Sequence, residues 1–574
     1  MNRQQIDEMT SALAGQLEER KPSGAIWRGH LSSSAISTSV AMFALYRTDS
    51  RKYASYVDAA AAWLISTMKE EGSWGDTLES PSNMTATLLS FTALYAVGKA
   101  PDQAKAYLTS RLGGIDDDHL VKGVLDYYGT DLTFSVPILV MCAMAGIVKD
   151  WNRIPNFPFE LTILPQRFFR FLRLPVVSYA IPALIAVGIL RFRKGKKGHL
   201  ASLRESFVPR CLEVLTGLQP DNGGFLEAAP LTGFVAMCMS AAGMADHVVT
   251  LRATDFLTAT VRDDGSWPID TDLACWVTSL SSKVLADGMN EGQKHELSAL
   301  IRKSAFTFKH YFTGAQPGGW GWSDLPGAVP DADDTSGALV ALHRVSDGKY
   351  CPEAGKGIEW LIALQNSDGG MPTFCKGWGK LPFDRSCADI SAHALLAYGL
   401  WMPSLPDDLK VKCRKSALRM LKWMKSNQAA DGSWTPLWFG DQDAPQEKNP
   451  VYGTATTVEY LSFSDSSLAA PMMEKGVAYL LSAQNPDGGW GGAPGVKSKV
   501  TMTAKAVAAL AAAGHADGEA VAKGFDYLYD VWQAGDICRP EPIGLYFSRL
   551  WYSEDMYNLT FTLNALNALK LKIS

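Results

Sequence analysis

The sequence predicts an all-α protein in which pairs of helices stack and close into an α/α barrel. Three observations lead to this fold class. A turn of the form Gln/Asp-x-Gly-aromatic recurs, an amphipathic helix precedes most copies, and an alanine-rich helix that begins with Thr or Ser follows most of them. From residue 225 onward, successive turns lie 42 to 63 residues apart, which suits one helical hairpin plus a variable loop. Helix pairs repeated in this way bury their apolar faces only against neighbouring pairs, and closure of the row gives a barrel.

The repeated turns place a glycine before an aromatic or large apolar residue. Helices flank them in a fixed order: Gly357–Leu364 is an amphipathic segment before one turn, and Thr335–Leu339 begins an alanine-rich segment after another. We expect the ring that ends each turn to stack on the preceding Gln and on the start of the next helix, and so to tie successive hairpins together. The turns end at Trp74, Phe225, Trp267, Trp320, Met371, Trp434 and Trp490.

The composition is that of a globular protein. With 574 residues, of which 47% are hydrophobic, the chain is long enough for two or more domains with separate cores. A formal net charge of −5 and a pI near 6.0 give no reason to expect a nucleic-acid partner. The nine cysteines form no CxxC pair and no regular framework, so we expect reduced thiols in a cytoplasmic protein.

The first twenty residues predict a helix. Apolar side chains recur there at helical spacing in an otherwise polar segment, at Ile6, Met9, Leu13 and Leu17. This pattern indicates an amphipathic helix and is not that of a secretion signal.

An uncharged stretch, Leu174–Leu190, lies between basic residues. It has 17 residues with prolines at 175 and 182, so it is a poor membrane-spanning helix. Two interpretations stay open. The stretch is a buried core helix, or it is an apolar surface that dips into one leaflet while its basic flanks meet anionic headgroups. Both hold if the helix lines a cavity that opens to the membrane.

Three carboxyl groups, those of Asp331, Asp333 and Asp334, lie within four residues at the start of an apolar helix. Mutual repulsion and burial raise the pKa of at least one carboxyl in such a cluster, so that a protonated acid persists near neutral pH. The alternative is a solvated helix N-terminus, where carboxylates cap free backbone N–H groups and suit the helix dipole. The surrounding repeats favour the proton-donating interpretation.

A second acidic element follows at Asp389 and His393. Their spacing of four residues puts both side chains on one face of a helix, where they can form a hydrogen bond. Such a pair on its own is more often structural than catalytic. Its presence together with the acidic cluster favours a functional pair.

Together these motifs resemble the squalene-hopene and oxidosqualene cyclases. The turns are similar to the QW repeats of that family, and Asp331–Thr335 is similar to the DxDDT signature of class II terpene cyclases. The stretch Leu161–Leu190 resembles the proline-rich, membrane-proximal part of the bacterial members. The resemblance implies two α/α-barrel domains, residues 22–250 and 250–574, with the helix of residues 1–21 joined to the second and the active cavity between them.

The resemblance also implies catalytic roles. Asp333 is the proton donor, Asp331 is its charged neighbour, Asp334 shapes the environment of the acid, and His393 with Asp389 forms the supporting pair. Protonation of a plain alkene makes a tertiary carbocation, so the acid must be unusually strong. A cationic imidazolium near the carboxyl pair stabilises the anion left behind.

Cyclisation moves positive charge through an apolar cavity, where aromatic faces stabilise the charge without trapping it. Trp322 lies nine residues before Asp331, as a cation-stabilising Phe does in the family, and Phe374 stands where the family has a Tyr. Trp438 and Tyr452 are similar to two further aromatic residues of the cavity. Each of the four also fits ordinary core packing.

These features predict a protonation-initiated cyclase of a long isoprenoid, with squalene as substrate and a hopene-like polycyclic triterpene as product. The alternative is a class II cyclase of a prenyl diphosphate, of drimenyl or copalyl type. No cofactor or metal is expected, and magnesium only with a diphosphate substrate. The expected partners are the polyprene substrate and a membrane surface. We therefore expect a monotopic protein on the cytoplasmic face of the cell membrane, and a homodimer stays open.

Three other classes fit less well. A protein prenyltransferase β-subunit needs an Asp-x-Cys zinc site, but Asp272–Cys275 has the wrong spacing. A class I terpene synthase needs an Asp-rich magnesium site, and Asp116–His119 lacks the DDxxD step. A non-catalytic α-solenoid would explain the repeats but not the joint presence of the acidic cluster and the Asp–His pair.

Overall fold

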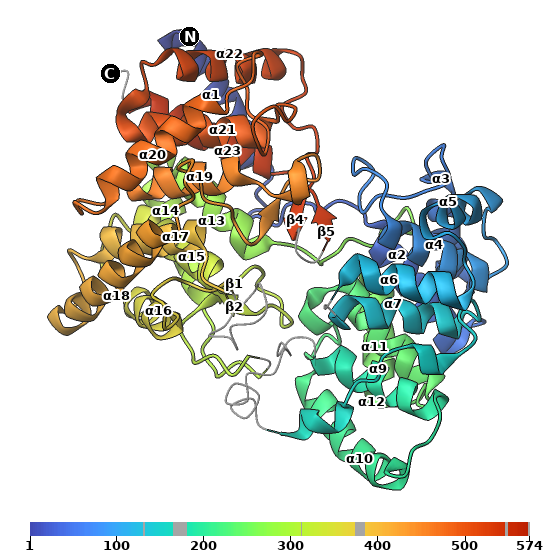
Figure 1. The fold of residues 1–574 in the computed structure, drawn as a ribbon. Helices are drawn as coiled ribbons and strands as arrows, with labels where there is room; N and C mark the ends of the chain where they lie inside the picture. Colours follow the sequence, from blue (N-terminus) through green and yellow to red (C-terminus); the bar gives the residue numbers. More distant parts are fainter. Residues whose placement is uncertain (130–131, 165–180, 312, 374–384, 546–548, 572–574) are drawn as a thin grey trace. The chain divides into compact units, whose positions relative to one another are not determined.

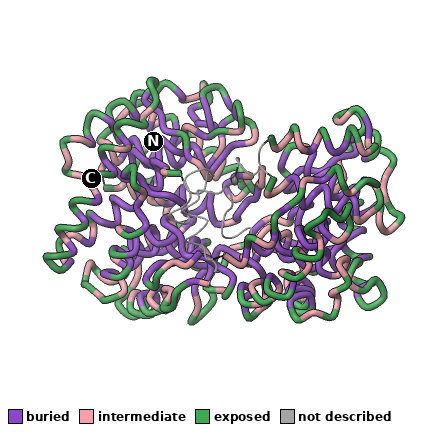
Figure 2. Tube along the Cα trace, turned by 60° about the horizontal axis from the view of Figure 1, so that its bottom comes forward, coloured by how far each residue is buried: buried purple, intermediate pink, exposed green. Residues whose placement is uncertain are grey.

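The computed structural model describes residues 1–129, 132–164, 181–311, 313–373, 385–545 and 549–571, and confirms the all-α prediction (Figure 1). The chain forms two compact units. We call residues 31–271 with 325–328 the first unit, and residues 1–30, 272–324 and 329–574 the second unit. In each unit the inner helices are buried along most of their length, whereas the outer helices keep an exposed face (Figure 2).

The first unit is a closed ring of helices. Among its described residues, each inner helix contacts the next, and the last contacts the first. The inner helices are α2 (Ala35–Asp49), α4 (Met84–Ala96), α7 (Leu132–Met144), α9 (Ile181–Lys194) and α11 (Ala229–Ala241). The outer helices are α3 (Ala54–Ser66), α5 (Asp102–Leu112), α6 (Asp117–Tyr128), α10 (Ala201–Leu218) and α12 (Val248–Ala259).

The second unit closes in the same way. Its inner helices are α13 (Ala274–Leu285), α15 (Ala332–Val345), α17 (Ala388–Trp401), α19 (Pro450–Leu461), α21 (Val500–Leu510) and α23 (Tyr557–Lys570), and α23 contacts α13. The outer helices that follow them are α14 (Glu291–Lys303), α16 (Pro352–Leu364), α18 (Asp407–Ser426), α20 (Ala469–Ser482) and α22 (Glu519–Gln533). The N-terminal helix α1 (Arg3–Glu19) packs on α22 and α23 and so supplies the outer helix that α23 lacks.

Short elements fill the loops. Strands β1 (Trp320–Gly321) and β2 (Pro330–Asp331) form one antiparallel pair, and β3 (Phe439–Gly440), β4 (Ile543–Leu545) and β5 (Leu550–Tyr552) form an antiparallel sheet in that order. The short helices are η1 (Trp151–Arg153), η2 (Phe159–Ile163), η4 (Phe225–Glu227), η5 (Ala286–Gly288), η7 (Pro445–Glu447) and η8 (Ala511–His515).

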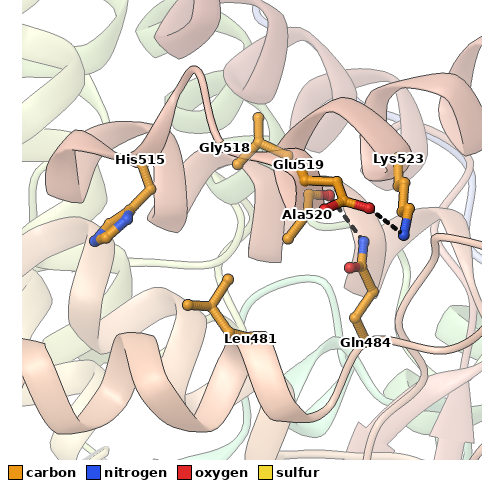
Figure 3. A pocket seen from close by; sticks show the side chains of 8 residues that line it. Leu481, Gln484, His515, Gly518, Glu519, Ala520 and Lys523 are labelled. Atoms are coloured by element: carbon orange, nitrogen blue, oxygen red, sulfur yellow. Dashed lines mark hydrogen bonds and ion pairs between the residues drawn. The ribbon is translucent and has the colours of Figure 1, made fainter.

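The glycine-aromatic turns join neighbouring hairpins by hydrogen bonds, as the turn at Trp490 shows. Its indole Nε1 donates to the carbonyl of Leu480 on the preceding outer helix (2.7 Å), and its backbone N donates to Thr503 Oγ1 on the next inner helix (3.0 Å). Gln484 Nε2 donates to the carbonyl of Ala520 on the next outer helix (2.8 Å; Figure 3). Gly488 has φ +86°, and a Cβ there would lie 2.6 Å from the Lys523 carbonyl oxygen, so the turn requires glycine.

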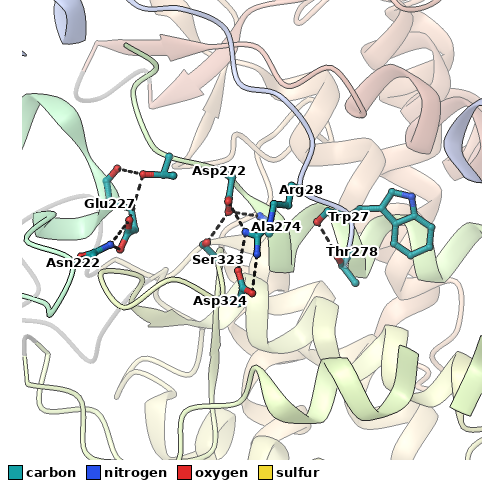
Figure 4. A network of polar contacts seen from close by, with 10 residues as sticks. Trp27, Arg28, Asn222, Glu227, Asp272, Ala274, Thr278, Ser323 and Asp324 are labelled. Carbon is teal, nitrogen blue, oxygen red and sulfur yellow. Dashed lines mark hydrogen bonds and ion pairs between the residues drawn. The ribbon is translucent and has the colours of Figure 1, made fainter. Parts of the chain in front are cut away.

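An eighth turn, which the sequence pattern missed, closes the second unit. Trp27 is buried, and its Nε1 donates to the carbonyl of Leu17 on α1 (2.8 Å). Its own carbonyl accepts from Thr278 Oγ1 on α13 (3.2 Å; Figure 4). This turn therefore links the outer helix α1 to the inner helix α13. The segment before it, Arg20–Ser23, has no Gln or Asp, which is why the turn did not match the pattern.

The division into units differs from the limits expected at residues 22 and 250. Residue 250 lies within α12, which packs on α2 and α11, so the first unit continues to Thr271. Residues 22–30 carry the turn at Trp27 and belong to the second unit.

The uncharged stretch Leu174–Leu190 is only partly within the described residues. Residues 181–190 belong to α9, an inner helix of the first unit, and Ile185 and Leu190 are fully buried there. Arg191 is also buried and donates to the carbonyl of Ile154 (2.8 Å). The prediction that this half of the stretch contacts a membrane is therefore wrong, because its side chains form the core. No described helix is long and apolar enough to cross a bilayer.

Candidate active site

The acidic cluster lies where β2 ends and α15 begins. Asp331 is the N-cap of α15, and its Oδ1 accepts a hydrogen bond from the backbone N of Asp334 (2.8 Å). Pairing of β2 with β1 fixes the backbone of Asp331 opposite Trp320, and the amide of Ala332 donates to the carbonyl of Thr373 (2.8 Å). The cap predicted by the alternative interpretation is present, but it is not solvated, because Asp331 and Asp334 are both buried.

Burial keeps protons on this pair of carboxyl groups. Loss of solvation raises the pKa of Asp331 to about 7 and raises the pKa of Asp334 well above its usual value. The two groups are hydrogen-bonded to each other, and the charge of Asp331 adds to the effect on Asp334. Near neutral pH, therefore, the pair carries at least one proton.

Asp333 has a different partner. Its Oδ1 lies 2.6 Å from Nδ1 of His393 on α17. The imidazole is buried, with 5% of its side chain exposed, whereas 22% of the Asp333 side chain is exposed. Asp333 is therefore the member of the cluster that has both a basic partner and an accessible surface.

The expected bond between Asp389 and His393 is not formed. Among the described residues, Asp389 Oδ1 accepts from the thiol of Cys387 (2.6 Å), and that sulfur accepts from the backbone N of Leu437 (3.2 Å). The spacing of four residues puts Asp389 and His393 on one face of α17, but it does not determine their hydrogen-bond partners. The imidazole of His393 bonds to Asp333 on α15 instead of to Asp389. Burial raises the pKa of Asp389 to about 6.

Two aromatic residues that the sequence did not single out enclose His393. The ring of Tyr460 on α19 stacks on the imidazole, with 4.7 Å between centroids and 22° between planes. Trp276 on α13 meets it edge-on, at 6.2 Å and 74°. Both lie on inner helices, and no sequence signal shows which buried position of an inner helix faces the ring centre.

The four predicted aromatic residues have different positions. Tyr452 is buried on α19, where its ring packs on Phe439 with 4.8 Å between centroids and lies 4.6 Å from Nζ of Lys505. The carbonyl of Trp322 accepts from the backbone N of Trp276 (3.1 Å) at the start of α13. Trp438 is half-buried and bonded to Tyr552. Phe374 lies outside the described residues.

Two other polar clusters, one in each unit, are paired internally. In the second unit, Arg28 Nη1 lies 2.8 Å from Asp272 Oδ2 and 3.1 Å from Asp324 Oδ1, and Ser323 donates to Asp272 (2.6 Å; Figure 4). In the first unit, Asn222 donates to buried Glu227 (2.7 Å). A pocket beside α22 is lined by Leu481, Gln484, His515, Gly518–Val521 and Lys523, but Lys523 pairs with Glu519 and Gln484 holds a turn (Figure 3).

The geometry is that of a Brønsted acid in apolar surroundings. Asp333 is held by an imidazole, which stabilises the carboxylate once the proton has left. The neighbouring pair of Asp331 and Asp334 keeps at least one proton close to Asp333 at neutral pH. Aromatic rings rather than nucleophiles surround the imidazole. This arrangement can protonate a neutral, apolar group.

Comparisons with known proteins agree with this chemistry. Residues 275–570 match the model of the squalene-hopene cyclase C-terminal domain. The squalene-hopene cyclase of Bradyrhizobium diazoefficiens is 24% identical over 519 residues, which cover 74% of this chain and 76% of that enzyme. The labda-7,13-dienyl diphosphate synthase of Streptomyces clavuligerus is 26% identical over 453 residues, or 76% of this chain and 73% of the synthase.

One relative is much longer. Enfumafungin synthase of Hormonema carpetanum is 24% identical over 522 residues, which cover 75% of this chain but only 38% of the synthase. Among solved structures, ent-copalyl diphosphate synthase from Streptomyces platensis matches with a TM-score of 0.57 at 18% identity. That match covers 99% of this chain and all of the synthase, so the two share a fold.

Proposed function

The chain belongs to the squalene-hopene cyclase family, a class II terpene cyclase family of enzymes, and from this membership we propose that it cyclises squalene to a hopene-like polycyclic triterpene. The observation that carries the chemistry is the 2.6 Å hydrogen bond between Asp333 and His393, beside a buried carboxyl pair that retains a proton. The similarity to squalene-hopene cyclases over three quarters of the chain supports the substrate.

In the proposed reaction Asp333 is the acid. Its O–H bond breaks, and the π electrons of the terminal alkene take the proton to form a C–H bond. The cation left on the tertiary carbon is attacked by the next double bond, so each ring closure forms a C–C bond and moves the charge along the chain. The last cation loses a proton or adds water. Hydrogen bonding from His393 stabilises the Asp333 carboxylate while the charge moves.

A second substrate class is favoured by one observation. The labda-7,13-dienyl diphosphate synthase matches about three quarters of each chain, and this supports a prenyl diphosphate as the alternative. A diphosphate needs unpaired cations. In the described part of the second unit, Arg28, Lys283 and Lys499 each pair with carboxylates. Lys505 has no carboxylate partner in that described part, but one ammonium group does not balance the charge of a diphosphate, so these pairings favour the hydrocarbon.

Incubation of the purified protein with squalene, with geranylgeranyl diphosphate and with farnesyl diphosphate, each with and without magnesium, tests the proposal. We expect a polycyclic hydrocarbon or alcohol from squalene, detected by gas chromatography and mass spectrometry. Turnover of the diphosphates alone would replace squalene by the second substrate class. Turnover of no isoprenoid would contradict both.

We also propose that the protein works at the inner face of the cell membrane, since squalene partitions into bilayers. Exposed Leu161, Leu200 and Leu203 lie on η2 and the start of α10, two elements that pack together, and Lys196 and Lys197 precede α10. An apolar surface flanked by basic residues suits an anionic bilayer. We make two secondary proposals: the reaction of a prenyl diphosphate would use magnesium, and the protein would form a homodimer in solution.

Vesicle flotation tests the membrane proposal. The double variant Leu200→Lys, Leu203→Lys should bind anionic vesicles several-fold less than the wild type. Val411→Lys with Leu418→Lys, which changes two comparably exposed side chains of α18, is the matched control and should bind as the wild type does. Equal binding of all three proteins, or no binding by the wild type, would contradict the proposal.

A further inference from the structure

A cluster of charged side chains is buried among the inner helices of the second unit. Glu459 and Lys505 are each 5% exposed. Nζ of Lys283 lies 2.7 Å from Glu459 Oε1, and Asn564 Nδ2 donates to the same oxygen (2.9 Å). With two ammonium groups and one carboxylate, the cluster has a net charge of +1.

Lys505 is the cation of the cluster that lacks a carboxylate of its own. Its Nζ donates to Thr456 Oγ1 (3.2 Å) and lies 4.6 Å from the ring of Tyr452 and 4.5 Å from the ring of Phe561. Among the described residues no carboxylate lies within ion-pair distance of it, because Glu459 is bonded to Lys283. Aromatic faces and one hydroxyl are a weak substitute for water.

Lys505 lies beside the acid site. Thr456, to which it donates, is four residues before Tyr460 on α19, and the ring of Tyr460 stacks on His393, the partner of Asp333. The titratable groups that act on Lys505 are Glu459 on α19, Lys283 on α13, Asp333 on α15 and Asp389 on α17. Burial lowers the pKa of Lys505 to about 8, and the three carboxylates oppose that effect. The rings of Tyr452 on α19 and of Phe561 on α23 also lie next to its ammonium group. An interaction between two charges is reciprocal, so an ammonium that Asp333 stabilises also stabilises the carboxylate of Asp333.

We propose that Lys505 is a positioning residue for the cyclisation: its ammonium group stabilises the carboxylate that Asp333 becomes on giving its proton to the substrate. This inference rests on the proposed function. A buried lysine without an ion-pair partner costs stability. Its retention inside the ring of inner helices is explained if the charge serves the reaction.

Steady-state rates of Lys505→Met give the first test, with whichever isoprenoid the wild type turns over. We expect about a tenfold lower kcat between pH 6 and 7.5, since one charge acts across a protein interior. The wild-type rate should fall as the pH rises through about 8, where Lys505 loses its proton, and this fall should be absent in the variant. Titration of Asp331 near pH 7 affects both proteins alike.

Stability gives a readout independent of activity. The pKa of Lys505 is lower in the folded than in the unfolded protein, so its contribution to stability is present above the unfolded pKa and is lost as the pH falls through about 8. Lys505→Met removes this loss, and the variant should unfold at a higher temperature than the wild type at pH 7. The difference should shrink above pH 8. A residue with only a structural role would instead lose stability on substitution.

Lys499→Met is the matched control from the same part of the chain. Lys499 precedes α21, is mostly buried, and pairs with Asp441 (2.5 Å) and Asp443 (2.9 Å). Its loss should lower the unfolding temperature and leave the pH profile unchanged. Glu459→Gln is a second variant: because Glu459 raises the pKa of Lys505, the fall near pH 8 should move to lower pH.

The outcomes separate the two levels of inference. A wild type that turns over no isoprenoid contradicts the proposed function itself. An active wild type with a Lys505→Met variant of equal rate and equal pH profile overturns the role of Lys505. A variant that is less stable, and slower only in proportion to its folded fraction, also overturns it and makes Lys505 a packing residue.

Discussion

The carboxyl groups at the start of α15 have different environments because successive residues of a helix point about 100° apart. Asp331 and Asp334, three residues apart, share one side and are buried against each other. Asp333 turns away from them toward His393 on α17. The chain thus separates a pair that holds a proton from an acid that is in contact with an imidazole.

Asp333→Asn should abolish turnover without unfolding the protein. The amide keeps the shape of the carboxyl group and still has an oxygen toward His393, but it has no proton acidic enough for an alkene. We expect a loss of at least about 10²–10⁴-fold in kcat, the range of a general acid, with an unfolding temperature near that of the wild type. Product analysis and thermal unfolding check this. A near-native rate would assign the acid to another residue.

Asp389 should make stability depend on pH. Burial raises the pKa of Asp389 in the folded protein from its ordinary value to about 6, so its contribution to stability is fully present below the unfolded pKa and is lost as the pH rises through about 6. Asp389→Asn should remove this loss and gain roughly 2–3 kcal/mol relative to the wild type above pH 7. Chemical unfolding between pH 4 and 7.5 measures it, with Asp126→Asn, an exposed carboxyl of α6, as the control. Parallel curves for the wild type and Asp389→Asn would contradict the expectation.

At this scale the sequence located the acidic cluster and His393 but not all of their contacts. A short run of carboxyl groups directly before an apolar helix is uncommon, so the acidic cluster can be recognised from the sequence alone. The partners of Asp389 and His393 depend on how α15, α17 and α19 pack. Tyr460, Trp276 and Lys505 appear in the sequence as ordinary members of buried helices, and only the closed ring brings them to the site.

The repeating element is the glycine-aromatic turn, which joins three helices. Its indole bonds backward to one outer helix and its amide bonds forward to an inner helix, as at Trp490. The sequence predicted these turns from glycine and aromatic residues at regular intervals. It missed the turn at Trp27, because the preceding Gln or Asp is absent and because ring closure joins the first helix to distant parts of the chain.

Trp27→Phe should cost about as much stability as Trp490→Phe. Each change keeps a buried aromatic ring and removes one indole N–H that donates to the carbonyl of Leu17 or Leu480. The loss of one such hydrogen bond costs about 0.5–1.5 kcal/mol. Urea unfolding followed by circular dichroism compares the two. A neutral Trp27→Phe beside a costly Trp490→Phe would show that the N-terminal turn is not equivalent to the others.

At the scale of the whole molecule, each unit depends on closing its own ring. The sequence predicted helical pairs and a barrel because a hairpin with an apolar face must be covered by the next hairpin. It could not assign Ile181–Leu190 to a membrane or to a core, since an uncharged run has the same composition in both. The closed ring decides this, because α9 contacts α7 on one side and α11 on the other.

Removal of residues 1–21 should unfold the second unit and spare the first. Helix α1 is the outer partner of α23, and Ile6, Met9, Leu13 and Leu17 are at most 2% exposed. Burial of each such side chain contributes about 1.5–3 kcal/mol, so together they contribute about 6–12 kcal/mol, which is comparable with the whole stability of a domain. Hydrogen exchange followed by mass spectrometry should show lost protection in α13–α23 and near-native protection in α2–α12, with no cyclase activity. Addition of a peptide of residues 1–21 should restore part of the protection, because it returns α1 and with it the Leu17 carbonyl that Trp27 binds. A truncated protein with native protection and activity throughout would mean that the ring of six inner helices holds without its outer partner.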